Sequence, residues 1–104
     1  MNNESLQINK EQTPEGIKFV IKGQISSSRA NDLRVTLEEA LKSGEVSIIL
    51  NMLEVGYLCS VGISIILNAY KTARQSGGTL VIEQPSENVR KVLIITSLDE
   101  MLIQ

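Results

Sequence analysis

The sequence predicts a single α/β domain spanning residues 1–104, with a mixed sheet of four to five strands and helices packed mainly on one face. Short apolar segments with a period of two indicate strands, and longer segments with apolar residues every three or four positions indicate helices. Between residues 46 and 83 these segments follow in the order strand, helix, strand, which favours a parallel pair. A length of 104 residues fits one domain.

The N-terminal quarter of the chain predicts a β-hairpin. Apolar residues alternate with polar ones in Leu6–Glu11 and again in Ile17–Ile25, where two lysines lie on the face opposite the apolar one. Between them, Thr13-Pro14-Glu15-Gly16 is a turn sequence, because proline presets the backbone angle and glycine supplies a positive φ. We expect the two strands to pair at one edge of the sheet.

A first helix is expected from Arg29 to Lys42. Its apolar residues form one stripe at spacings of three and four: Ala30, Leu33, Leu37, Ala40 and Leu41. Ser26-Ser27-Ser28 precede it and offer hydroxyl groups that suit a helix N-cap. Gly44 follows it and suits a left-handed C-terminal cap.

The next segments predict a buried strand and a loop. Val46–Leu50 is a run of apolar residues with little alternation, which is typical of a strand covered on both faces. We expect Asn51–Leu58 to form a loop, broken by Gly56.

A second helix is predicted from Ser60 to about Ser76. Its expected buried stripe consists of Ile63, Ile66, Leu67, Tyr70 and Ala73. Gly77-Gly78 ends the helix and leads directly into a strand at Thr79–Glu83. A third helix is expected from Glu87 to about Thr96, and Leu98–Ile103 forms either a short strand or an extra turn.

The composition excludes several functional classes. The chain has no His and one Cys, which removes the usual general base and the usual metal ligands, so we expect no metal and no cofactor. A net charge of −2 with scattered basic residues disfavours nucleic acid. The apolar runs are too short to span a membrane, and the polar N-terminus does not resemble a signal peptide, so we expect a cytoplasmic protein.

The start of the second helix is the expected functional site. Ser60 is either an N-cap or a phosphoacceptor, because the free N–H groups and dipole of a helix start favour a phosphate. Cys59 is either a small, half-buried residue or a thiolate activated by the same dipole. Gly62 allows the first turn to approach a neighbour closely. Tyr57 is either a core anchor or an exposed contact.

Three stretches of the sequence together resemble the STAS domain of bacterial anti-sigma-factor antagonists. They are Val46-Ser47-Ile48-Ile49-Leu50-Asn51, then Leu58-Cys59-Ser60-Val61-Gly62-Ile63 at a helix start, and Gly77-Gly78-Thr79-Leu80-Val81 after that helix. In addition, Gly23-Gln24-Ile25-Ser26 is similar to the Gly-Glu-Leu-Asp that precedes the family's first helix. The resemblance covers nearly the whole chain and implies one STAS domain.

The resemblance implies a partner-switching protein that is not itself an enzyme. Such proteins bind an anti-sigma factor of the histidine-kinase-like ATPase type, which then releases its sigma factor. The same partner is a serine kinase that phosphorylates the antagonist and disarms it, and a serine phosphatase restores it. By matching positions, Ser60 is the phosphorylated residue. The implied partner-binding surface consists of Gly23, Gln24, Ser26, Ser27, Tyr57, Cys59, Ser60, Val61 and Gly62.

The sequence departs from the family at three positions where Asp is usual, namely Ser26, Asn51 and Cys59. The resemblance places the missing carboxylates near the phosphoacceptor. Their loss favours an alternative, a non-phosphorylated STAS adaptor or scaffold subunit of a larger signalling or transport complex. A small thiol or nucleotide-dependent enzyme that uses Cys59 is disfavoured, because the sequence lacks His and a phosphate-binding loop. We expect a monomer or a weak homodimer that associates through Leu98–Ile103 or a sheet edge.

Overall fold

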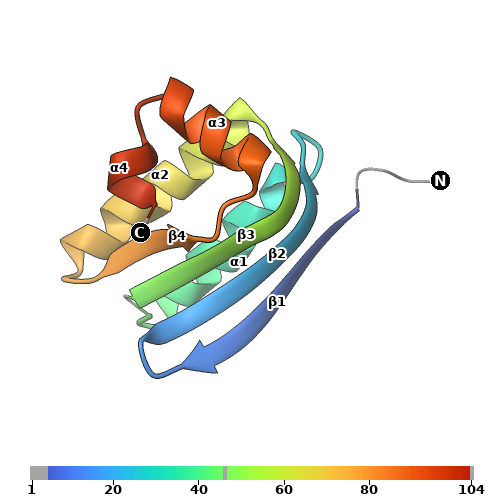
Figure 1. The fold of residues 1–104 in the computed structure, drawn as a ribbon. Coiled ribbons are helices and arrows are strands. Elements are labelled where there is room, and N and C mark those ends of the chain that lie inside the picture. Colours follow the sequence, from blue (N-terminus) through green and yellow to red (C-terminus); the bar gives the residue numbers. More distant parts are fainter. Residues whose placement is uncertain (1–4, 46, 104) are drawn as a thin grey trace.

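The computed structural model describes residues 5–45 and 47–103. In this part of the chain the elements follow one another as β1 (Leu6–Thr13), β2 (Gly16–Ile25), α1 (Ala30–Lys42), β3 (Ser47–Leu58), α2 (Ser60–Gln75), β4 (Thr79–Glu83), α3 (Glu87–Ile95) and α4 (Asp99–Leu102). The four strands form one sheet in the order β1-β2-β3-β4 (Figure 1). β1 and β2 pair antiparallel, whereas β2, β3 and β4 run parallel, so the predicted mixed sheet is confirmed.

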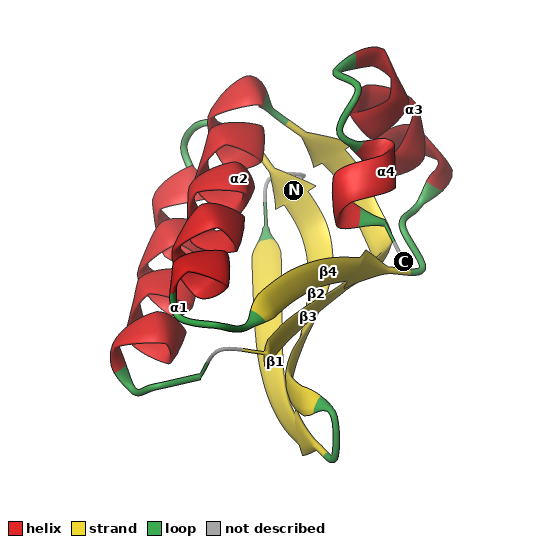
Figure 2. Ribbon diagram, turned by 90° about the vertical axis from the view of Figure 1, so that its left-hand side faces the viewer, coloured by secondary structure: helices red, strands yellow, loops and turns green. Residues whose placement is uncertain are grey.

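The helices divide into two pairs around the sheet. α1 and α2 lie side by side along one face, whereas α3 and α4 lie apart from them, beside β4 and the curved end of β3 (Figure 2). α1 and α2, the two long helices, therefore cover the face of the sheet that carries the core.

No helix of the described residues is long and apolar enough to cross a membrane.

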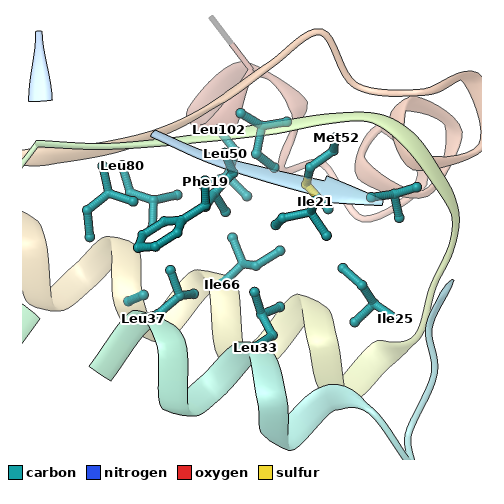
Figure 3. Packing of buried hydrophobic residues seen from close by; sticks show 14 of the residues in the cluster. Phe19, Ile21, Ile25, Leu33, Leu37, Leu50, Met52, Ile66, Leu80 and Leu102 are labelled. Atoms are coloured by element: carbon teal, nitrogen blue, oxygen red, sulfur yellow. The ribbon is translucent and has the colours of Figure 1, made fainter. Parts of the chain in front are cut away.

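The core is almost entirely aliphatic. Every second residue of β2 from Ile17 to Ile21 is fully or nearly fully buried, and the same alternation continues in β3 and β4. Leu33 of α1 and Ile66 of α2 point from their helices toward the sheet (Figure 3). Apolar burial of this kind provides the main favourable free energy of folding.

The third strand is longer than the sequence indicated. The segment Asn51–Leu58, expected to be a loop, continues β3 and pairs with β2 as far as Leu58. The register shifts twice along this pair, and β3 carries the extra residues, one of them Gly56. Such bulges break the period-two alternation, so Met52, Val55 and Leu58 are buried at spacings of three. The sequence of Asn51–Leu58 therefore lacks the period-two alternation that predicts a strand. Val46, where we expected the strand to begin, lies outside the described residues.

The helix boundaries agree with the prediction within one or two residues, but two details differ. α1 has Arg29 as its N-cap residue without a side-chain cap, so the predicted capping by Ser26-Ser27-Ser28 is wrong. Gly44 has a φ of +95°, which fits its predicted place after the helix. In α2 the fully buried residues are Gly62, Ile66, Ala69 and Ala73, and the expected Ile63, Leu67 and Tyr70 are only partly buried.

The C-terminal segment combines both expected forms. It contains the short helix α4, and Ile103 then forms an isolated parallel bridge with Ile82. Ile103 therefore lies beside β4.

Replacing Leu37 with Ala should destabilise the protein by about 2–4 kcal/mol, because it leaves a cavity between α1 and the sheet. Leu37 is 1% exposed, whereas Val35 in the same helix is 39% exposed. Val35→Ala is therefore the matched control and should change the free energy of unfolding by less than about 0.5 kcal/mol. Urea denaturation of both variants measures this. Equal losses would contradict the assignment of the buried face.

Candidate functional site

The site forms where β2 and β3 end together. Ile25 and Leu58 are the last paired residues of the two parallel strands, and the N–H of Cys59 donates to the carbonyl oxygen of Ile25 at 2.9 Å. α2 begins at the next residue, Ser60. Because the carboxyl ends of parallel strands meet at one edge of the sheet, the start of α2 lies beside the chain that leaves β2 at Ser26.

Cys59 is the N-cap of α2. Its Sγ accepts a hydrogen bond from the N–H of Gly62 at 3.3 Å, and its backbone is extended, as an N-cap requires. The side chain is only 8% exposed. The cap expected at Ser60 therefore lies one residue earlier, and the sulfur occupies the place that a hydroxyl or carboxylate oxygen takes in more common caps.

Ser60 is thereby left free of a capping role. It is the first residue of α2 and is exposed, and its hydroxyl has no hydrogen-bond partner among residues 5–45 and 47–103. Two neighbours along the chain are also exposed, Tyr57 by 53% and Val61 by 50%. Of the two alternatives for Tyr57, the core anchor is therefore wrong.

Gly62 allows α2 to lie against the strand ends. A Cβ atom at this position would lie 2.8 Å from Cγ2 of Ile25 and 2.8 Å from Cδ1 of Leu58. Such distances are too short for carbon atoms, so any side chain would push the helix away. The close approach predicted for Gly62 is confirmed.

The β2 side of the site is polar and uncharged. Gln24 pairs with Tyr57 across the strands, and its side chain covers Gly56. Ser26 and Ser28 share a hydrogen bond between their hydroxyl oxygens at 3.1 Å, and Ser27 is exposed.

Gly23 has a backbone role in this part of the structure. Its φ is +114°, and a Cβ atom there would lie 2.1 Å from the carbonyl oxygen of Ser5. Only glycine fits this close crossing of β1 and β2.

The first turn of α2 carries no acidic residue. The charged groups on the neighbouring segments are engaged within the chain: Lys22 with Glu54 at 3.7 Å and Arg29 with Asp32 at 3.9 Å. Tyr57, Ser60 and Val61 therefore form an exposed surface without charge of its own, which we call the switch surface.

Two residues that support the site were missed in the sequence. Ser86 Oγ donates to the carbonyl oxygen of Val55 at 2.6 Å, and Asn88 Nδ2 donates to that of Gly56 at 2.9 Å. These two bonds hold the start of α3 against the C-terminal end of β3, next to the switch surface. In the sequence, Ser86 and Asn88 lie only at a predicted helix start. No local pattern connects them with Val55 and Gly56, about thirty residues earlier.

Asn51 belongs to a different part of the sheet. It precedes Leu58 by seven residues, which corresponds to about 20 Å along a strand. The expected position near the phosphoacceptor is therefore wrong for this residue. Its Nδ2 donates to Glu83 at 2.9 Å, and Lys18 forms an ion pair with the same carboxylate at 2.9 Å. The hydrogen bond from Asn51, followed by that from Lys18, lowers the pKa of Glu83.

The chain matches the STAS domain family over residues 7–103 and belongs to that family. It is 29% identical over 76 residues to BtrV of Bordetella bronchiseptica, covering 73% of this chain and 66% of BtrV. It is 26% identical over 93 residues to the anti-sigma-B factor antagonist of Listeria monocytogenes, covering 89% of this chain and 82% of that protein.

Solved structures share the fold. The anti-sigma factor antagonist SpoIIAA in its unphosphorylated form superposes with a TM-score of 0.80 at 21% identity, covering 95% of this chain and 86% of the other. The phosphorylated form of SpoIIAA from Bacillus superposes with a TM-score of 0.74 at 20% identity, covering 95% and 89%. The predicted family and fold are therefore confirmed.

Cys59→Ala should lower the free energy of unfolding by about 1 kcal/mol, because the N–H of Gly62 loses its acceptor. Cys59→Ser should retain most of the stability, since a hydroxyl can accept the same bond. Ser60→Ala is the matched control and should have an effect below about 0.5 kcal/mol. Thermal and urea unfolding of the three variants measure this. A larger loss for Ser60→Ala than for Cys59→Ala would show that the cap lies at Ser60.

Asn51→Asp should destabilise the protein at neutral pH, because it replaces a donor to Glu83 with a second carboxylate. The lowered pKa of Glu83 means that its stabilising contribution is present above about pH 4.5 and is lost as the pH falls through its folded-state value. The deficit of the variant should therefore shrink in acid, as one of the two carboxylates takes up a proton.

The control for this variant is Asn31→Asp. Asn31 lies on an exposed turn of α1 and accepts a hydrogen bond from Arg34, so a carboxylate there meets a cation. It should not destabilise the protein at neutral pH. Unfolding curves of both variants measured between pH 7 and pH 3 test this, and a deficit for Asn51→Asp that grows in acid would contradict the assignment.

Proposed function

We propose that the protein is an anti-sigma factor antagonist that binds a kinase-like anti-sigma factor through its switch surface and is disarmed by phosphorylation of Ser60. The proposal rests on family membership, on the Listeria relative named for this activity, and on the fold it shares with SpoIIAA. The binding surface also includes Gln24 at the end of β2 and Ser26 and Ser27 in the turn that follows.

The observation that supports this proposal best is the exposed, unbonded hydroxyl of Ser60 at the first residue of α2. A protein kinase needs its target hydroxyl accessible, and a hydroxyl engaged in capping would first have to be released. Here Cys59 performs the capping, so Ser60 is available in the folded protein.

Phosphorylation of Ser60 changes the surface strongly and the fold little. A phosphate adds about −1.5 to −2 charges, and the first turn of α2 carries no acidic residue of its own. The first N–H groups of the helix and its dipole favour the phosphate, so its cost to stability is small. The close packing at Gly62 holds the helix start in place. A partner that fits the uncharged surface would be opposed by the new charge.

The chain takes part in this cycle as a substrate and a ligand, without catalysis of its own. The anti-sigma factor supplies the serine kinase activity, and a separate serine phosphatase restores the binding form. We place this exchange in the cytoplasm.

A second candidate function is that of a STAS adaptor that binds its partner without being phosphorylated. The observation that favours it is Cys59, which stands where the family resemblance expects Asp and turns its side chain into the helix cap. The chain therefore offers no carboxylate directly before Ser60 to assist a kinase.

Incubation with the cognate anti-sigma factor and ATP should add one phosphate to wild-type protein, as detected by intact-protein mass spectrometry. Ser60→Ala should accept none, whereas Ser76→Ala, the matched control at an exposed serine at the other end of α2, should accept one. Binding to the anti-sigma factor without any phosphorylation would replace the switch by the adaptor function.

Ser60→Asp should weaken binding to the anti-sigma factor by about tenfold or more, equivalent to about 1.4 kcal/mol, because it places an unmatched charge in the interface. Ser60→Asn introduces a side chain of nearly the same shape as Asp but without charge, and it should bind within a few-fold of wild type. Isothermal titration calorimetry measures both affinities. If Ser60→Asp binds as tightly as Ser60→Asn, the electrostatic switch is contradicted.

A further inference from the structure

The edge of β3 that faces β4 has no strand beside it beyond Asn51. β4 pairs with β3 only from Ser47 to Asn51, whereas β3 itself continues to Leu58. After β4, the backbone of Gln84 has a φ of +49°, and Pro85 has no N–H to donate to a neighbouring strand. The chain therefore leaves the sheet where β4 ends, and the carbonyl groups farther along β3 need other partners.

The start of α3 supplies these partners. The N–H of Ser86 donates to the carbonyl oxygen of Met52 at 3.0 Å, and the Oγ of Ser86 donates to that of Val55 at 2.6 Å. Asn88 Nδ2 donates to the carbonyl oxygen of Gly56 at 2.9 Å. The same Ser86 oxygen caps α3, so the helix start is joined to the curved end of β3 (Figures 1 and 2).

Gly56 is the residue of this edge that β2 does not hold. The pairing with β2 passes from Val55 directly to Tyr57, so Gly56 is the extra residue of a bulge and has no paired residue in β2. The next residue, Tyr57, belongs to the switch surface and is 53% exposed. The bond from Asn88 therefore fixes the backbone directly before Tyr57.

We propose that Asn88 is a positioning residue of the switch surface. Its amide fixes the carbonyl group of Gly56, and this holds the side chain of Tyr57 in the orientation in which it contacts the anti-sigma factor. Without this donor the carbonyl group bonds to water, and the bulged end of β3 gains alternative conformations. Ordering these conformations again on binding lowers the affinity for the partner. The inference rests on the proposed function, because it names a residue that acts on the same binding surface.

The loss of this one amide leaves α3 in place. Val89 and Leu93 of α3 are buried, and Ser86 keeps its bonds to β3 when Asn88 is replaced. Asn88 itself is exposed, so its replacement removes nothing from the core. The change is therefore confined to the bulged end of β3, and it should lower the affinity for the partner without unfolding the protein.

Asn88→Leu tests the first step in the free protein, because leucine has nearly the shape of asparagine and no donor. Amide hydrogen exchange measured by NMR should be about three- to tenfold faster than in wild type over residues 55–58 and unchanged in α1. Asn68→Leu makes the same substitution at an exposed asparagine of α2 and is the matched control. It should leave exchange over residues 55–58 unchanged, and urea unfolding should show that both variants are folded.

Isothermal titration calorimetry with the anti-sigma factor tests the second step. Asn88→Leu should bind about three- to tenfold more weakly than wild type, whereas Asn68→Leu should bind within about twofold of it. Tyr57→Ala removes the side chain that Asn88 positions. In the Tyr57→Ala background, Asn88→Leu should therefore have no further effect on affinity, which a double-mutant cycle measures as coupling between the two residues.

Three outcomes overturn the inference while the proposed function stands. Unchanged exchange over residues 55–58 in Asn88→Leu would show that the amide does not hold the bulge. Equal affinities of Asn88→Leu and wild type would show that the position of Tyr57 does not depend on it. Equal losses with and without Tyr57 would show that Asn88 contacts the partner itself. Failure of the wild-type protein to bind the anti-sigma factor is a distinct result, which overturns the proposed function and the inference together.

Discussion

The joint end of β2 and β3 is the constraint on which the rest of the structure depends. Two parallel strands finish at the same level, and the bond from Cys59 N–H to Ile25 carbonyl oxygen fixes the residue at which the chain leaves the sheet. The helix must therefore start within one residue of that point. The absence of a side chain at Gly62 then allows the helix to settle against Ile25 and Leu58. The exposure of Ser60 follows from this geometry.

Much of the fold could be predicted because its signals are local. The stripe of α1, the glycines after each long helix and the hairpin turn all depend on residues close in sequence. The far half of β3 could not be predicted, because its conformation depends on pairing with β2. Bulges in that pair bury Met52, Val55 and Leu58 at a spacing that resembles neither a strand nor a helix. The hydrogen bonds between β2 and β3, which join residues far apart in the sequence, make this segment a strand.

The start of the second helix was predicted from the sequence, but the roles of Cys59 and Ser60 in it were not. Sequence alone indicated a helix start around residue 60, and the structure separates the capping sulfur of Cys59 from the free hydroxyl of Ser60. The contribution of Asn88 was invisible, because it reaches Gly56 across thirty-two positions of the chain.

The single thiol of the chain has one further consequence. Cys59 is buried and its sulfur is bonded to the first turn of α2, so a thiol reagent can reach it only when that turn opens. The rate of labelling therefore measures the opening equilibrium of this one helix end, separately from global unfolding. With no second cysteine in the sequence to compete, the protein carries its own site-specific probe of local stability.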